Sequence, residues 1–181
     1  ETASLYKYLL FVSNFDIIEK GLPDCSVLGV LWSIAIEEQF YFIWPIFISF
    51  TPRKFLPWLC SFIIALSVYF RYINTNYFII EYHTLSCIGD LATGALGAYF
   101  VFYGTLEKYF SEIGRIFILS IYLLFFGFFF FRTNIQLCLG KFSAFERIAS
   151  SAAMLCIILE QNYAKRSIFK LGRLRLFSYL G

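Results

Sequence analysis

Long uncharged segments constrain this chain more than any other feature. Three stretches of 16 residues carry no charge, at residues 55–70, 91–106 and 116–131. Each forms about 24 Å of α-helix, close to the hydrocarbon thickness of a bilayer, which is about 30 Å. A fourth stretch, residues 25–52, carries only two charges. We therefore expect several membrane-spanning helices, whose ends borrow flanking residues to complete the span.

The amino-acid composition supports the same environment. The chain is 60% hydrophobic and 15% charged, whereas soluble domains are roughly 45–50% apolar and about 25% charged. Its net charge of +3 is too small to indicate a nucleic-acid partner. With one histidine and no cluster of Cys and His, we expect no metal site. The expected surroundings are a lipid bilayer.

The predicted fold is all-α, a polytopic transmembrane helical bundle with about five spans plus partial helices at both ends. Residues 5–18 are expected to end an earlier helix, and residues 168–181 to approach a later one. The weakest predicted span is 148–159, which reaches across a bilayer only if Arg147 or Glu160 lies at the membrane edge. The apolar runs are continuous and do not alternate with period two, which argues against strands.

We interpret residues 1–181 as one domain, because neither a flexible linker nor a repeat interrupts it. The chain starts at Glu1 and stops inside an apolar run, so we expect an incomplete membrane domain. The connections between spans fall into two alternating sets, one for each side of the membrane. One set holds nine basic residues and the other five, among them Arg71. The positive-inside rule therefore places the first set, which includes Arg53 and Lys54, in the cytoplasm of a multi-pass protein of the inner or plasma membrane.

Two adjacent carboxylates, Glu37 and Glu38, interrupt the first long apolar run. An acidic residue at the centre of a spanning helix costs about 2.5–3.5 kcal/mol of insertion free energy. We therefore expect the pair to face a cavity or a partner. On a helix they point about 100° apart, so one narrow pocket does not receive both without local unwinding. An interfacial belt of aromatic and charged groups is the alternative, although it does not explain paired carboxylates.

The segment around this pair, Leu31–Pro45, reads LWSIAIEEQFYFIWP. It resembles the signature L-W-S-L-x-[VI]-E-E-Q-F-Y-x-x-W-P of the acyltransferase-3 family of integral membrane acyltransferases. Residues 11–15 are similar to the family's segment before that signature. Residues 83–98 resemble a later family helix ending in L-x-x-G-A-L-x-A, with Cys87 where many members carry Arg. Residues 177–181 resemble the start of a further helix.

This resemblance implies a membrane-bound O-acyltransferase. Such enzymes move an acyl group, here expected to be acetyl, from acyl-CoA as co-substrate to a hydroxyl of an extracytoplasmic carbohydrate acceptor. Cell-surface polysaccharide, lipopolysaccharide and peptidoglycan are the expected acceptors. The family's proposed catalytic histidine lies upstream of Glu1, so we expect the present segment to be inactive alone. Glu37 and Glu38 are the predicted catalytic residues, as a general base or, preferably, to orient that histidine.

Further site residues are predicted around the carboxylates and at the cytoplasmic end. Substrate contacts are expected from Trp32, Ser33, Gln39, Tyr41 and Asp90. Arg53 and Lys54 are expected to bind the coenzyme A phosphates, with membrane anchoring as the alternative for both. The alternative for Asp90 is a helix-start residue at the membrane interface. The spacing of Gly94 and Gly97 predicts a face of small residues on the helix of residues 91–106, which allows close helix packing.

Two other function classes remain open. Carboxylates inside a membrane also serve ion coupling, so a transporter or a flippase of a sugar-linked substrate is the main alternative. Against it, the sequence shows no pair of helices broken by glycine or proline, which transporters often use. A non-catalytic membrane scaffold is the third hypothesis. The oligomeric state is left open.

Overall fold

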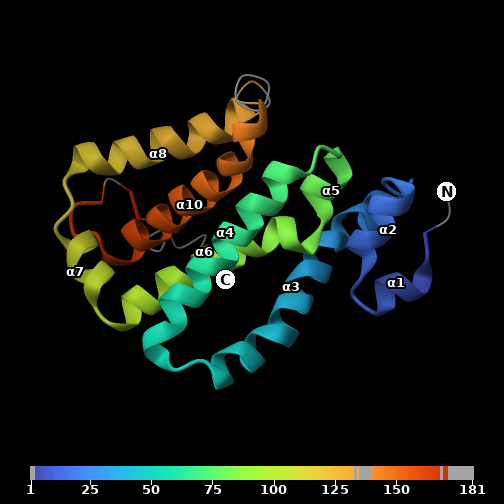
Figure 1. Ribbon diagram of the computed structural model, residues 1–181. Helices are drawn as coiled ribbons and strands as arrows, with labels where there is room; N and C mark the ends of the chain where they lie inside the picture. The colour runs from blue at the N-terminus through green and yellow to red at the C-terminus, as the bar shows by residue number, and fades with distance from the viewer. Residues whose placement is uncertain (1–2, 133, 135–139, 168, 171–181) are drawn as a thin grey trace. The chain divides into compact units, whose positions relative to one another are not determined.

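The computed structural model describes residues 3–132, 134, 140–167 and 169–170, and this part of the chain is helical without strands (Figure 1). Its helices are α1 (Leu5–Leu9), α2 (Ser13–Lys20), α3 (Ser26–Phe50), α4 (Leu56–Ile73), α5 (Tyr77–Tyr82), α6 (Thr84–Phe102), α7 (Thr105–Ser111), α8 (Arg115–Phe130) and α10 (Glu146–Tyr163). Two 3-10 turns, η1 (Arg53–Phe55) and η2 (Gly140–Phe145), precede α4 and α10. The predicted all-α class is confirmed. Residues 177–181, which carry the last part of the family resemblance, lie outside the described residues.

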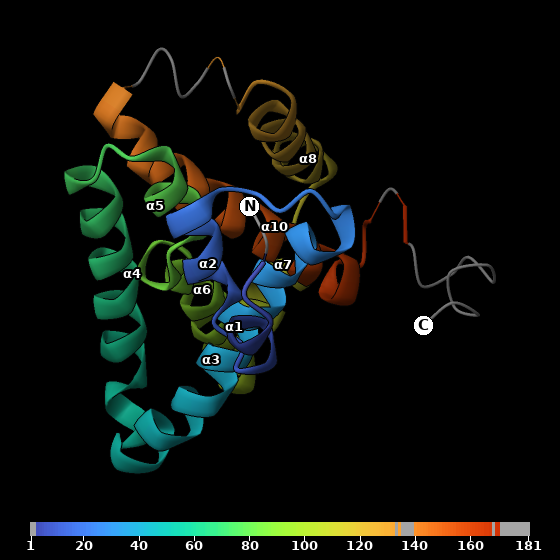
Figure 2. The same cartoon turned by 90° about the vertical axis from the view of Figure 1, so that its right-hand side faces the viewer.

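Four helical segments are long and apolar enough to cross a membrane: Ser26–Phe50, Arg53–Ile73, Tyr77–Phe102 and Phe142–Tyr163. Helices α7 and α8 make a fifth if they are counted as one span, although they are bent by 110° at the break between them. The prediction of about five spans is therefore confirmed. The first two spans, α3 and α4, diverge from η1 as the arms of a V (Figure 1 and Figure 2).

Two predicted span boundaries are wrong. The third span begins at Tyr77 and not near residue 91, because the Asn76 side chain accepts hydrogen bonds from the backbone N–H groups of Phe78 and Ile79 and starts a helix there. The last span covers Phe142–Tyr163 rather than residues 148–159, so Glu160 lies within the helix. Charged residues inside these spans, among them Asp90 in the third and Arg147 in the last, hid both extensions from a search for uncharged runs.

The N-terminal segment is not the end of one long helix. A break at residues 10–12, where Phe11 takes a φ of 54°, separates α1 from α2. The two short helices are joined by Asp16, whose Oδ2 accepts from the Ser4 backbone N–H at 2.9 Å. Lys7 and Lys20 each place their Nζ 3.4 Å from Asp16 Oδ1. Burial raises the pKa of Asp16, but the hydrogen bonds from Ser4 and the charge of Lys20 outweigh it, so the pKa is lowered.

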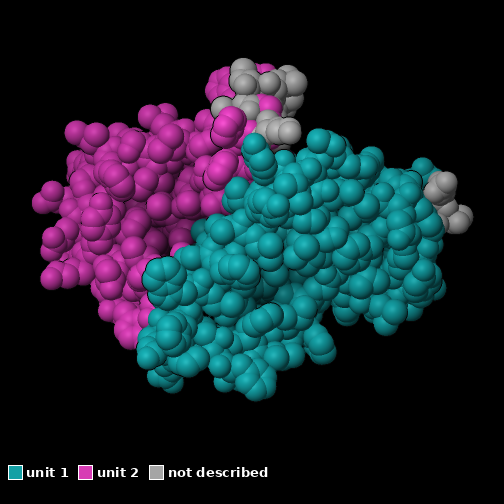
Figure 3. Space-filling view, in the orientation of Figure 1, with its two compact units in different colours: residues 1–95 teal, residues 96–181 magenta. Residues whose placement is uncertain are grey.

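The chain divides into two compact units, residues 1–95 and 96–181 (Figure 3). The first unit has a small apolar core formed by Ile17, Ala35, Ile36, Phe40, Cys60 and Ile63. In the second unit α10 packs against α7 and α8 around Phe110, Ile113, Ile118, Ile121, Leu159 and Ala164. Large apolar side chains remain exposed in both, among them Phe50 at 83% and Ile116 at 86%. Such surface is typical of helices in contact with lipid or with other spans.

Gly97 lies at a close contact between α6 and α10 inside the second unit. A Cβ added there would lie 2.6 Å from Leu155 Cδ1 on α10, whereas one added at Gly94 would meet nothing within 4 Å. The predicted small-residue face therefore makes its close packing contact at Gly97 and not at Gly94.

Candidate functional site

The segment that carries Glu37 and Glu38 lies within α3, which runs as one helix of 25 residues and keeps Pro45 inside it. No unwinding occurs at the carboxylates, so they point to different sides of the helix, about 100° apart. Both side chains are exposed in the described chain. Ala35, Ile36 and Phe40, on the opposite side, bury the helix in the first unit.

Gln39, the next residue, is held by a polar network that links three parts of the first unit. Its Nε2 donates to Phe11 O at 2.7 Å and to Asn14 Oδ1 at 3.0 Å, and its Oε1 accepts from Thr84 Oγ1 at 2.6 Å. Asn14 Nδ2 in turn donates to Thr84 Oγ1 at 3.0 Å and to Tyr82 O at 3.1 Å. The Asn14 residue is 0% exposed. These hydrogen bonds join α2, α3 and the start of α6, and they hold the part of α3 that carries the two carboxylates in position.

The aromatic residues of the same segment make contacts both with another helix and within α3. Trp32 packs edge-on against Tyr82, with ring centroids 5.0 Å apart. Phe40, which is buried, stacks on Trp44 at the same centroid distance. The Trp32–Tyr82 contact, together with the amide network, fixes the rotation of α3 about its own axis.

A small recess lies beside this network. Its volume is about 30 Å³, and its wall is formed mainly by apolar side chains of α3, α4 and α6, with Gln39 and Thr84 at one side. Such a space has room for about one water molecule and is far too small for a sugar or a thioester. Neither Glu37 nor Glu38 lines it. The recess therefore belongs to helix packing, and the catalytic role of the two carboxylates stays a prediction.

The structure places the remaining predicted site residues at separate points. Ser33 Oγ donates to Val30 O in its own helix at 3.1 Å, and Tyr41 is 57% exposed. Asp90 is half-buried in the second turn of α6, which begins at Thr84. The alternative that Asp90 starts a helix is therefore wrong.

Arg53 and Lys54 are exposed on η1, beyond the other end of α3, with Lys54 Nζ 5.0 Å from the centre of the Phe55 ring. From Glu37 to Phe50 the helix rises about 20 Å. The described structure thus brings Trp32, the carboxylates and Gln39 into one region and leaves the two cations in another.

Sequence reasoning missed a buried cation near this region. The pattern of charges predicts Arg71 in a connection between spans, but it lies in the last turn of α4 with 4% exposure. Its Nη1 donates to Ile80 O at 2.8 Å and to Ser86 Oγ at 2.9 Å. Ser67 Oγ donates to Ser86 O at 2.9 Å, and Ser86 Oγ donates to Ile80 O. The spacing of Ser67 and Arg71, four residues apart on one face of an apolar helix, was the available signal.

A second missed group lies in the other unit. Glu160 is 1% exposed, and its Oε2 accepts from Tyr122 OH at 3.0 Å and from Gln161 Nε2 at 2.8 Å. The sequence predicts Glu160 at the membrane edge, and its place in the last turn of α10 leaves that a prediction, but the structure adds that α8 covers this side chain. This burial follows only from the packing of α8 against α10, because Tyr122 and Glu160 are 38 positions apart along the chain.

Comparison with known proteins gives one informative match. A stretch of 47 residues, 26% of this chain, is 55% identical to part of the peptidoglycan O-acetyltransferase OatA of Listeria monocytogenes. The match covers only 6% of that protein. No protein-family model matches the chain, and no solved structure matches it. The chain is therefore similar over about a quarter of its length to an O-acetyltransferase, which indicates an acyltransferase, and membership of the acyltransferase-3 family stays a prediction.

Proposed function

We propose that this chain is part of a membrane-bound O-acetyltransferase that moves an acetyl group from acetyl-CoA to a hydroxyl of an extracytoplasmic carbohydrate. The observation that carries the proposal is the 47-residue similarity to a protein named as a peptidoglycan O-acetyltransferase. The four or five possible spans support a membrane location. Peptidoglycan is the acceptor that the match favours over other surface polysaccharides.

The reaction asks for a group that accepts a proton. As the acceptor hydroxyl attacks the acetyl carbon, a new C–O bond forms, the C–S bond breaks, and coenzyme A leaves as its thiol with the proton. Glu37 or Glu38 accepts that proton from the hydroxyl and passes it to the departing thiolate, or orients the histidine that does so. Because the two side chains point about 100° apart, one of them faces the reaction centre. Gln39 holds the helix that carries them through Asn14 and Thr84.

The acyl donor and the acceptor need separate binding groups. In the proposal, Trp32, Ser33, Tyr41 and Asp90 contact the sugar or the acyl group. Arg53 and Lys54 bind the coenzyme A phosphates at the end of α3 predicted to be cytoplasmic. Since about 20 Å of helix separates these cations from the carboxylates, the donor must bind in an extended form along α3.

The test uses the complete protein in its own cell envelope. Glu37→Gln and Glu38→Gln each keep the side-chain size and remove the charge, and peptidoglycan O-acetylation is measured by mass spectrometry of muropeptides. We expect peptidoglycan O-acetylation to fall about 100-fold or more in at least one variant, which is the usual contribution of acid–base catalysis. Membrane insertion stays unchanged. Glu107→Gln, an exposed carboxylate of α7, is the matched control, and normal acetylation in both test variants removes the proposed role.

One observation favours the alternative of a transporter or flippase. The sequence showed no broken helix pair, but α7 and α8 are separated by a sharp break that contains Gly114. Transporters build substrate sites from discontinuous helices of this kind. Labelled acetyl-CoA separates the two functions, because an acyltransferase leaves label covalently bound to the glycan. Movement of a sugar-linked substrate without covalent label would favour transport.

A further inference from the structure

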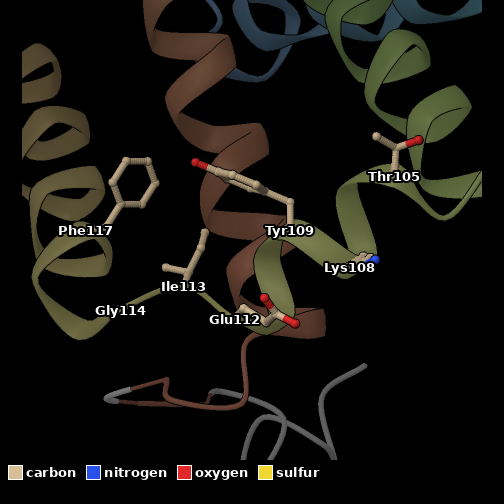
Figure 4. A pocket seen from close by; sticks show the side chains of 7 residues that line it. All are labelled: Thr105, Lys108, Tyr109, Glu112, Ile113, Gly114 and Phe117. Atoms are coloured by element: carbon tan, nitrogen blue, oxygen red, sulfur yellow. The ribbon is translucent and has the colours of Figure 1, made fainter.

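An open cavity of about 560 Å³ lies at the break between α7 and α8 in the second unit (Figure 4). Gly114 lies at the break, and the side chains that line this elbow cavity are Thr105, Lys108, Tyr109, Glu112, Ile113 and Phe117. Ile113 is 7% exposed and belongs to the apolar core that α10 completes. Ile113 therefore anchors the cavity to that core, whereas the other lining residues are exposed. Its volume is that of a small-molecule site.

The cavity changes from charged to apolar along its length. Figure 4 shows Lys108 and Glu112 toward one end, Tyr109 and Phe117 toward the other, and Ile113 between them. Phe117 belongs to α8, the apolar part of the broken span, whereas Lys108 belongs to the short α7. In a membrane the charged end therefore lies at the level of the lipid headgroups, and the aromatic end faces the acyl chains.

The charged end carries one cation and one anion. Lys108 and Glu112 are four residues apart, a spacing that puts their Cβ atoms about 5–6 Å from each other on a helical turn. In the part of the chain that the structure describes, neither of them takes part in a salt bridge. Both side chains are exposed. The two side chains thus offer a ligand one positive and one negative group at this end of the cavity.

We propose that the elbow cavity binds a phospholipid with a phosphoethanolamine headgroup. The phosphate lies against Lys108, and the primary ammonium donates to the Glu112 carboxylate. The glycerol and the first part of the acyl chains lie along Ile113, Tyr109 and Phe117. An anionic lipid without an ammonium would be repelled by Glu112, and a choline headgroup has no N–H to donate to it.

Lipid binding at the elbow cavity is independent of acyl transfer, so a binding measurement tests it without depending on the proposed enzyme activity. The complete protein is purified in detergent, and its binding of phosphatidylethanolamine, phosphatidylcholine and phosphatidylglycerol with identical acyl chains is measured by native mass spectrometry. We expect phosphatidylethanolamine to bind about fivefold or more tightly than the other two. Lys108→Met and Glu112→Gln each weaken that binding about five- to tenfold, since one charge contact at a headgroup is worth roughly a factor of that size.

Two controls keep the outcome clear. Glu107→Gln changes a carboxylate of the same short helix that does not line the cavity, and it binds the lipid like the wild type. The exchange Lys108→Glu with Glu112→Lys keeps one charge of each sign, so it retains the preference for phosphatidylethanolamine over phosphatidylglycerol. Equal or tighter binding of phosphatidylglycerol or phosphatidylcholine by the wild type overturns the proposal. So does unchanged phosphatidylethanolamine binding by Glu112→Gln.

Discussion

Removing the Asn14 side chain tests whether the amide network holds α3 in place. Asn14 is fully buried and makes three hydrogen bonds, to Tyr82 O, to Thr84 Oγ1 and from Gln39 Nε2. A buried neutral hydrogen bond contributes about 1 kcal/mol net to the free energy of unfolding. Asn14→Ala removes all three, so we expect a loss of about 3 kcal/mol.

Asn14→Asp is a sharper change at nearly the same side-chain volume. The carboxylate still accepts from Gln39, but its second oxygen faces the carbonyl oxygen of Tyr82 in place of a donor. A buried charge without a compensating partner costs about 3–5 kcal/mol. We therefore expect Asn14→Asp to destabilise the protein at neutral pH at least as much as Asn14→Ala.

Thermal unfolding of the complete protein in detergent measures both variants. For a domain of 150–250 residues, 1 kcal/mol corresponds to about 2–4 °C in Tm, so the domain that contains Asn14 should melt about 6–12 °C lower in Asn14→Ala. Asn162→Ala is the control, because this exposed side chain donates only to Ile158 O of its own helix in the described structure, at 2.8 Å. Its effect should stay within about 0.5 kcal/mol. A shift below about 2 °C for Asn14→Ala, or a milder effect of Asn14→Asp, would refute the reasoning.

Two further predictions concern packing and pH. Gly97→Leu overpacks the contact with Leu155 of α10 and should lower the free energy of unfolding by about 1–3 kcal/mol. The control Gly94→Leu meets open space and should melt no lower than the wild type. Equal melting temperatures of the two variants would contradict the assigned contact. Because the pKa of Asp16 is lowered in the folded protein, its charge stabilises α1 and α2 above the unfolded-state pKa of about 3.9, and this stabilisation is lost as the pH falls through the folded-state pKa. The protection of the amides in α1 and α2, measured as the exchange rate relative to the intrinsic rate at each pH, should therefore fall on acidification in the wild type and depend less on pH in Asp16→Asn.

The spans were predictable because the cost of placing a charge in hydrocarbon acts on each segment separately. A search for uncharged runs therefore located the helices that contain residues 55–70 and 116–131 close to their observed bounds. It failed where polar groups are satisfied locally, as at Asn76, whose cap extends the third span to Tyr77. It failed again at Phe11, where a local change of φ breaks a helix without any breaker residue.

The candidate site shows the same division. The pattern around Glu37 and Glu38 indicated acyl transfer, and the match to an O-acetyltransferase supports that class. The sequence pattern did not indicate that Gln39 forms hydrogen bonds with Asn14 and Thr84, because these residues lie 25 and 45 positions away along the chain. No periodicity within one helix encodes such a contact.

The sequence by itself determined that this protein is a set of apolar helices for a membrane, since helix formation and hydrocarbon solvation depend on local composition. Tertiary structure alone decided which polar side chains lie inside. Arg71 and Glu160 are buried between helices, and Glu37 and Glu38, which stand in an equally apolar run, are exposed in the described chain. The physical reason is that a buried polar group needs its hydrogen-bond partners, and here the partners come from other helices that only the fold brings near.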